Sequence, residues 1–375
     1  MGIELFITII ILILLFNFFN NMKVLSKPKR KRLSEDTPLI SILVPARNEE
    51  DNIESCLLSL LHQDYPNTEV IVLDDNSSDR TTEIIESLIS KYPKLKLIYG
   101  RSLPEGWTGK NFACHQLAFY SRGDWLLFTD ADTIHSPYSV SLVFNAVKDS
   151  DIDLLSLIPH IRAETFAEKL FMPLIPFAFL VFLPIGLMNR VKDFRVTAAI
   201  GPFILIKRDF YFKIGGHKAI KDKLLDDFCL AQLTKLSGGR VSLLDGSEIV
   251  SVRFYKNLKE IWNGFSKNAF GAIGGSLPTL LAFLFINILV FILPYYLLWE
   301  GIFKGHSINL PLLQVLLISL IRGIISLRFR TNFLMIFLHP VSMIFGIVIA
   351  LNSARIALLK KVVEWKGRFY PVMEG

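Results

Sequence analysis

The chain has 375 residues, of which 51% are hydrophobic, with a mean hydropathy of +0.43 and a formal net charge of +7. A soluble domain of this size rarely has so apolar a composition, so part of the chain is expected in lipid. The three cysteines, Cys56, Cys114 and Cys229, form no C-x-x-C pair, and their spacing fits neither a zinc site nor a disulfide framework.

The chain begins with an apolar run, Ile3 to Phe19, that carries one charge, Glu4. The run is just long enough to span a bilayer core. No basic segment precedes it and no small-residue cleavage site follows, so residues 1–22 are expected to be an uncleaved membrane anchor. The basic stretch 23–38 comes next, and the positive-inside rule places it in the cytoplasm as a linker.

Region 39–270 alternates expected strands with expected helices. The strands are short apolar runs at 39–44, 69–73, 94–99 and 125–128. Asn48 is expected to cap the first helix, since the acidic residues that follow suit a helix N-terminus. The alternation predicts an α/β domain, a parallel sheet with helices on both faces. In such sheets ligands bind at the carboxyl ends of the strands.

Three polar clusters follow strands at that edge: Pro45–Glu49, Asp74–Asp79 and Thr129–Asp132. Asp130 and Asp132 leave the fourth strand two residues apart and can converge on one hard cation, Mg²⁺ or Mn²⁺, which prefer oxygen ligands. An isolated Asp-x-Asp is more often a solvated turn. Its place after a buried strand, one strand after Asp75, favours the metal interpretation.

A second acidic pair, Asp226 and Asp227, precedes an apolar pattern that indicates a helix. Either carboxylate could serve as a general base that removes a proton from an acceptor hydroxyl. The alternative is that both merely cap the helix N-terminus.

One apolar run with three prolines, residues 170–188, falls inside the expected domain. A full span there would place the two halves of the domain on opposite sides of the membrane. An interfacial segment or a lining for a lipid acceptor is therefore expected, with a buried core helix as the alternative.

The C-terminal region, 271–375, holds three further hydrophobic segments, at about 277–299, 310–325 and 333–350. The cluster Arg322, Arg328 and Arg330 should be cytoplasmic. The basic tail raises a conflict, because a simple fourth span would place it outside. Pro340 could break the last segment into a re-entrant hairpin that returns the tail, and the sequence leaves both arrangements open.

At this point the chain resembles glycosyltransferase family 2, which has the GT-A fold. The stretches that carry the resemblance are Ser41–Glu50 (SILVPARNEE), Val70–Thr81 (VIVLDDNSSDRT), Phe128–Asp132 (FTDAD) and Leu225–Leu230 (LDDFCL). Three more are similar to the branch that glycosylates membrane lipids, which includes ceramide glucosyltransferases, hopanoid-associated and carotenoid-acid glycosyltransferases: Leu103–Asn111 (LPEGWTGKN), Ile214–His217 (IGGH) and Trp365–Arg368 (WKGR).

The resemblance implies a Rossmann-like nucleotide-sugar domain and a role for each matching residue. Pro45, Ala46, Asn48 and Glu49 would line the nucleoside pocket, and Asp75 would bind the base, uracil by preference. Lys110 would lie near the nucleotide. Asp130 would contact the donor sugar or ribose and share a metal site with Asp132. Asp227 would be the base of an inverting displacement, with Asp226 beside it.

The chain departs from the family pattern in two places. The family often has Glu-Asp where this chain has Asp226-Asp227, which blurs the identity of the base. The Q-x-x-R-W motif is not intact, which argues against a processive synthase. Arg253, Tyr255 and Lys256 stand in the corresponding region and are candidates to face the diphosphate.

The expected protein is thus an integral membrane enzyme with a cytoplasmic catalytic domain, which transfers a hexose from a nucleotide sugar to a membrane lipid and binds no nucleic acid. A polyprenyl phosphate acceptor or the initiation of a polysaccharide is the alternative. A nucleotidyltransferase is disfavoured because the loop after the first strand has no glycine. A non-enzymatic membrane scaffold is disfavoured by the two acidic pairs.

Overall fold

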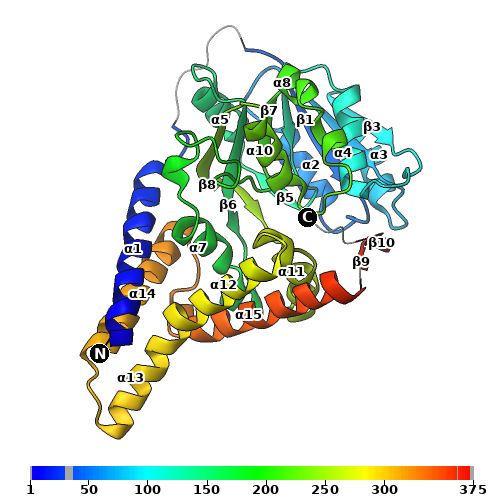
Figure 1. The fold of residues 1–375 in the computed structure, drawn as a ribbon. Coiled ribbons are helices and arrows are strands. Elements are labelled where there is room, and N and C mark those ends of the chain that lie inside the picture. The colour runs from blue at the N-terminus through cyan, green and yellow to red at the C-terminus, as the bar shows by residue number, and fades with distance from the viewer. Residues whose placement is uncertain (1, 30–36, 361, 372–375) are drawn as a thin grey trace. The chain divides into compact units, whose positions relative to one another are not determined.

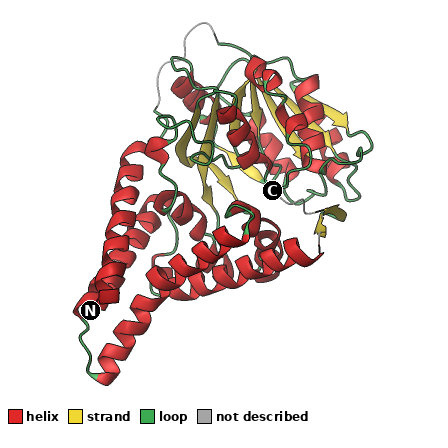
Figure 2. Cartoon of the chain, in the orientation of Figure 1, coloured by secondary structure: helices red, strands yellow, loops and turns green. Residues whose placement is uncertain are grey.

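The computed structural model describes residues 2–29, 37–360 and 362–371, which form two compact units (Figures 1 and 2). The sheet unit comprises Leu25–Arg162 and Ile185–Phe254. The helical unit comprises Met1–Val24, Ala163–Pro184 and Tyr255–Gly375. Residues 163–184 and 255–270, expected within one domain with the sheet, therefore pack with the helices.

The sheet unit holds eight strands and the helices that connect them. The strands are β1 (Ile40–Ala46), β2 (Thr68–Asp74), β3 (Leu95–Tyr99), β4 (Trp125–Phe128), β5 (Thr133–His135), β6 (Leu154–Ile161), β7 (Ile204–Lys207) and β8 (Val241–Val252). The helices are α2 (Ile53–Leu61), α3 (Thr81–Ile89), α4 (Gly109–Tyr120), α5 (Ser139–Val147), the 3₁₀ turn η1 (Ile185–Leu187), α8 (Arg208–Lys213), α9 (Gly216–Ala219) and α10 (Asp226–Leu236).

The strands form one mixed sheet in the order β3-β2-β1-β4-β7-β6-β8-β5. The first four are parallel, as the alternation of strands and helices predicts. The prediction of an all-parallel sheet is wrong for β7, which is antiparallel to both neighbours, and for β5, which is antiparallel to β8. Neither strand is among the four that the sequence predicted, and no crossover helix lies between β4 and β5.

The sheet has a continuous core because both its faces are covered. Ile40, Ile42 and Val44 of β1 point to one face, where they meet Ile53 and Leu57 of α2. Successive side chains of a strand point to opposite faces, and α4 packs against β1 and β2. Each such fully buried Ile or Leu stabilises the fold by about 1.5–3 kcal/mol. This packing fixes the strand ends that carry the polar clusters.

The helical unit contains helices of very different lengths and one small hairpin. Its elements are α1 (Gly2–Val24), α6 (Phe166–Phe171), α7 (Leu174–Val181), α11 (Leu258–Ala272), α12 (Leu277–Asn287), the π-helical turn η2 (Ile288–Ile292), α13 (Leu293–Lys304), α14 (Asn309–Phe329), the 3₁₀ turn η3 (Phe333–Ile336), α15 (His339–Arg355), the π-helical turn η4 (Ile356–Lys360), β9 (Val362–Trp365) and β10 (Arg368–Pro371).

Four helical stretches are long and apolar enough to cross a membrane: Gly2–Val24, Leu277–Lys304, Asn309–Phe329 and His339–Leu359. The first three overlap the predicted anchor and the predicted segments 277–299 and 310–325. The fourth begins later than the predicted segment 333–350, because residues 333–336 form a separate 3₁₀ turn. Pro340 does not interrupt the last of them. It stands in the first turn of α15, where a proline costs no hydrogen bond.

The proline-containing run 170–188 folds into short helices that pack on α1. Asn21 of α1 donates to the carbonyls of Leu180 and Leu183, and Asn17 donates to that of Val181. These carbonyls lie at the end of α7, where the helix itself supplies no donor. The side chains of Phe177 and Leu180 are buried within the unit, so much of this apolar surface is covered by protein.

Candidate active site

The loops that follow β1 and β2 are tied to each other. The Asn48 side chain accepts a hydrogen bond from the Ser78 backbone at 2.8 Å, and the Asn48 N–H donates to Ser77 Oγ. The prediction that Asn48 caps α2 is wrong, because α2 begins at Ile53 after a turn. Asn48 instead takes a left-handed conformation, φ 51°, that aims its amide at the neighbouring loop. The two loops thus form one rigid rim at the strand ends.

The predicted nucleoside-pocket residues lie in or beside this rim. Ala46 ends β1 and its carbonyl accepts a hydrogen bond from the Asp75 N–H at 2.8 Å. Asp75 is 4% exposed. The Glu49 N–H donates to Thr81 Oγ1 at the start of α3. Pro45, Ala46, Asn48, Glu49 and Asp75 are therefore neighbours at one edge, and their roles toward a nucleoside remain predictions.

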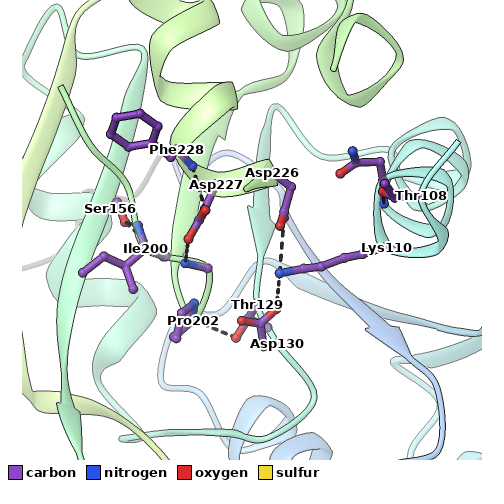
Figure 3. Close-up of polar contacts among 12 residues, drawn as sticks. Thr108, Lys110, Thr129, Asp130, Ser156, Ile200, Pro202, Asp226, Asp227 and Phe228 are labelled. Atoms are coloured by element: carbon purple, nitrogen blue, oxygen red, sulfur yellow. Dashed lines mark hydrogen bonds and ion pairs between the residues drawn. The ribbon is translucent and has the colours of Figure 1, made fainter. Parts of the chain in front are cut away.

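Lys110 joins the two acidic motifs that lie far apart in the sequence. Its Nζ is 2.7 Å from Asp130 Oδ1 and 3.2 Å from Asp226 Oδ2. Figure 3 draws both contacts as dashed lines. Burial alone would lower the pKa of Lys110, but Asp130, Asp226 and Asp227 outweigh it and raise that pKa well above its ordinary value. The ammonium therefore stays charged and holds the end of β4 to the start of α10.

Asp227 has different partners from Asp226. Its Oδ2 accepts from the Gly201 N–H at 2.9 Å and its Oδ1 from the Phe228 N–H at 2.7 Å (Figure 3). Burial, and next the charge of Asp226, raise the pKa of Asp227 to about 6. A carboxylate with such a pKa is suited to accept a proton near neutral pH.

A glycine permits this close approach. A Cβ on Gly201 would lie 2.7 Å from Asp130 Oδ2 and 3.3 Å from Lys110 Nζ. Any side chain there would push apart the lysine and the carboxylate. The segment 197–201 was missed in the sequence, because a lone glycine before a strand gives no signal of a close contact with a site 70 residues away.

The position of Lys110 depends on two neighbours in the segment 103–111. Thr108 Oγ1 caps α4 by accepting from the Asn111 N–H. The buried Asn111 amide donates to the carbonyls of Ile220 and Lys223, at 2.6 and 2.9 Å. Asn111 thereby fixes the loop that leads into Asp226. The sequence singled out this stretch as a motif but gave Thr108 and Asn111 no role.

His217, from the IGGH stretch, lies behind the end of β4 rather than in the open part of the site. Its Nδ1 is 2.9 Å from Tyr211 Oη, and its ring packs on Phe128. Burial, then the charges of Lys110 and His115, lower the pKa of His217 to about 3. A neutral, enclosed imidazole supports packing and is not placed to exchange protons.

Of the predicted metal pair, Asp130 shares Lys110 with Asp226, whereas Asp132 lies in different surroundings. Asp132 lies near the Cys56 thiol, whose pKa is raised by burial and next by the charges of Asp132 and Glu49. Within the part of the chain that the structure describes, no three His, Cys, Asp or Glu side chains form a ready metal cluster. Any cation at Asp130 and Asp132 would therefore need further oxygen ligands.

The candidates for contacts with a diphosphate fall at a junction of the chain. Arg253 directly follows β8 and belongs to the sheet unit, whereas Tyr255 and Lys256 begin the helical unit. The Tyr255 ring packs on Phe265 of α11, over Gly264. Their proposed role is therefore not tested by the geometry of either unit.

Comparison with known proteins agrees with this geometry. The family model described as glycosyl transferase family 2 matches residues 41–215. The 4,4'-diaponeurosporenoate glycosyltransferase of Staphylococcus aureus (strain USA300) is 26% identical over 359 residues, which cover 92% of this chain and 91% of that protein.

Among solved structures, a mannosyltransferase from Pyrobaculum calidifontis, in complex with GDP-Man and Mn²⁺, matches with a TM-score of 0.58 and 16% identity. The match covers 96% of this chain and 99% of that one, and shows a shared fold. With the mixed sheet and the acidic residues at its strand ends, these findings establish that residues 41–215 are a glycosyltransferase family 2 domain, that the fold is GT-A, and that the chain is a glycosyltransferase.

Proposed function

We propose that the chain transfers a sugar from a nucleotide-sugar donor to a membrane lipid, with inversion at the anomeric carbon. The observation that carries the proposal is that Asp226 and Asp227 have different partners. Lys110 neutralises Asp226, while Asp227 keeps a raised pKa and accepts hydrogen bonds from the backbone N–H groups of Gly201 and Phe228. This asymmetry favours Asp227 as the base.

In the proposed reaction, Asp227 accepts the proton of the acceptor hydroxyl or carboxyl group. The acceptor oxygen forms a bond to the anomeric carbon as the bond from that carbon to the diphosphate oxygen breaks. The nucleoside diphosphate leaves with the bonding electron pair. A single displacement of this kind inverts the configuration. Lys110, held by Asp130 and Asp226, contributes a fixed positive charge close to this chemistry.

The chemistry of the donor set fits a divalent cation. Asp130 and Asp132 leave β4 two residues apart, and their carboxylates supply the oxygen ligands that Mg²⁺ and Mn²⁺ prefer. We propose that Asp130 and Asp132 hold the cation together with the donor diphosphate. When bound, the cation would neutralise the charge of the leaving group.

The acceptor is proposed to be a lipid because the same chain carries four helices apolar enough to span a bilayer. The S. aureus relative is named for 4,4'-diaponeurosporenoate, a carotenoid acid. A UDP-hexose is the proposed donor, on the resemblance to the lipid-glycosylating branch. The catalytic unit is proposed to face the cytoplasm, since Lys23, Lys27 and Lys29 follow the anchor directly.

The test is transfer of label from UDP-glucose into lipid by the purified full chain, with Mn²⁺ and a lipid extract of the source cells. We expect Asp227→Asn to lower turnover by about 10²- to 10⁴-fold, the usual contribution of a general base, while donor affinity stays nearly unchanged. Asp209→Asn, which removes an exposed carboxylate on α8 of the same unit, is the matched control.

Three outcomes would count against the proposal. No label in lipid from UDP-glucose, other UDP-sugars or GDP-mannose would reject the lipid acceptor. Equal losses of donor affinity and rate in Asp227→Asn would reject Asp227 as the base. Label that appears only when a polyprenyl phosphate is supplied would replace the proposed acceptor with that alternative class.

A further inference from the structure

Arg322 is a cation buried in the helical unit, on an apolar helix long enough to span a membrane. It lies on α14 and is 1% exposed. Its Nη1 donates to the Pro173 carbonyl at 3.2 Å, and its guanidinium carbon lies 5.7 Å from the centre of the Phe177 ring. Its Nε is buried without a hydrogen-bond partner. A guanidinium has five N–H donors and keeps its charge in proteins, so these contacts satisfy it only in part.

His339 lies in the same region and is also unsatisfied. It is the first residue of α15, is 0% exposed, and neither ring nitrogen has a hydrogen-bond partner. Its ring packs against those of Phe177 and Phe291, with centroids 5.0 and 5.6 Å away. Phe177 thus contacts both Arg322 and His339, so the two polar groups share one aromatic neighbour.

Several breaks in the helices meet around these two residues. Pro173 lies in the break between α6 and α7, and its carbonyl accepts the hydrogen bond from Arg322. The π-helical turn Ile288–Ile292, which includes Phe291, precedes Pro294. The N-terminus of α15 presents backbone N–H groups that its own helix cannot satisfy. Interrupted helices inside membrane proteins are tolerated where they line a binding site, and half-helix N-termini there face anionic groups.

Nothing in the described part of the chain neutralises Arg322. None of the ion pairs among those residues includes it. An unpaired charge in a membrane interior is costly, and such residues usually face a partner. The helix N-terminus adds positive potential to that of Arg322. An anionic group beside Arg322 and this N-terminus would offset both positive potentials.

We propose that Arg322 and His339 form an intramembrane site for the anionic headgroup oxygens of a membrane amphiphile, a lipid phosphate or a lipid carboxylate. Arg322 lies seven residues before Phe329, the end of α14, which is about 10 Å along a helix. Arg328 and Arg330 stand at that end. A headgroup that dips one or two turns below the basic end of α14 would reach the site. The inference is separate from the transfer reaction proposed above.

The experiment measures lipid-dependent stabilisation of the delipidated full chain in dodecyl maltoside. A ligand that binds only the folded state raises the apparent Tm with its concentration. We expect phosphatidylglycerol or oleate to raise the Tm of the wild type, and Arg322→Met to need at least about tenfold more lipid for the same rise. Arg355→Met removes the same charge from an exposed position at the end of α15 and should follow the wild type.

The substitution to Met is chosen because a buried cation replaced by an apolar group of similar length often leaves a fold stable. If Arg322→Met fails to fold, His339→Leu and Arg322→Lys replace it. His339→Leu should also weaken the lipid response, and Arg322→Lys should retain part of it. Lipid retained on the purified protein, counted by native mass spectrometry, gives a second readout.

Equal responses of the wild type and Arg322→Met would overturn the proposal. A rise of the same size with phosphatidylcholine would overturn the requirement for an anion and leave general solvation by lipid. A full response to inorganic phosphate alone would overturn the assignment to a lipid. Responses to phosphatidylglycerol alone or to oleate alone would each support the site and identify the phosphate or the carboxylate as its ligand.

Discussion

The groups around Asp227 set its pKa. Burial and the charge of Asp226 raise its pKa to about 6, although two backbone N–H groups favour the ionised form. A general base works only when ionised. We therefore expect kcat/KM to fall about tenfold for each pH unit below about pH 6. Initial rates measured across this range test the assignment, and a rate that stays level down to about pH 4.5 would contradict it.

Lys110 connects this base to the rest of the site. Its charge lowers the pKa of Asp227, so Lys110→Met should move the acid limb of the pH profile upward by roughly one unit. We also expect about a ten- to hundredfold loss of kcat/KM at neutral pH, because Asp130 and Asp226 lose their shared cation.

Lys207→Met is the matched control for Lys110→Met. It breaks another lysine–aspartate pair of the sheet unit, that with Asp153 at 3.2 Å. The control should leave the pH profile in place. If Lys110→Met lowers the rate equally at every pH, the lysine does not set the pKa of the base.

At the scale of elements, the sequence predicted the parallel half of the sheet well. Residues 125–128 were expected as a strand and form β4, and the other three predicted strands match within two residues. Buried parallel strands are continuous apolar runs, which can be recognised in the sequence without knowledge of the tertiary structure. Once these strands were located, the polar residues that follow each of them could be identified as well.

What the sequence could not predict depends on contacts between distant segments. Gly201 approaches Asp130 and Lys110, and Asn111 binds the loop before Asp226, over separations of about 70 to 110 residues. Neither contact produces a local pattern. The Asn48 cap was predicted wrongly for the same reason, since the partner that its side chain finds is in the next loop, not in its own helix.

Gly216, the first residue of α9, gives a test of packing at this scale. A Cβ on Gly216 would lie 2.2 Å from the Tyr211 ring, at φ 50°. Gly216→Ala should therefore destabilise the sheet unit by more than about 3 kcal/mol, from overpacking added to backbone strain. Gly238→Ala, at φ 82° with no atom nearby, should cost only about 1–2 kcal/mol. Denaturant midpoints of the two variants separate the effects, and equal losses would refute the packing argument.

At the scale of the whole molecule, the packing of the helical unit helps to decide on which side of the membrane the basic C-terminal tail lies. Its α11 follows the sheet unit in the chain and begins with an exposed polar turn. The second half of α15 packs on α11, where Asn352 donates to Ser266 and Ser353 accepts from the Phe270 N–H. A helix that ends beside α11 is expected to end on the side of the membrane where the chain leaves the sheet unit. The end of α1 lies with that of α14, since Arg328 donates to the Met22 carbonyl.

This packing predicts that the tail returns to the cytoplasm although α15 is long enough to span the bilayer. In a Cys229→Ser background, where the remaining cysteines are buried, Lys366→Cys should react with an impermeant maleimide only after cells are permeabilised. Ser237→Cys, exposed in the sheet unit, should behave alike, and Ser307→Cys, between α13 and α14, should react in intact cells. Labelling of Lys366→Cys in intact cells would contradict this prediction and would show that α15 crosses the membrane.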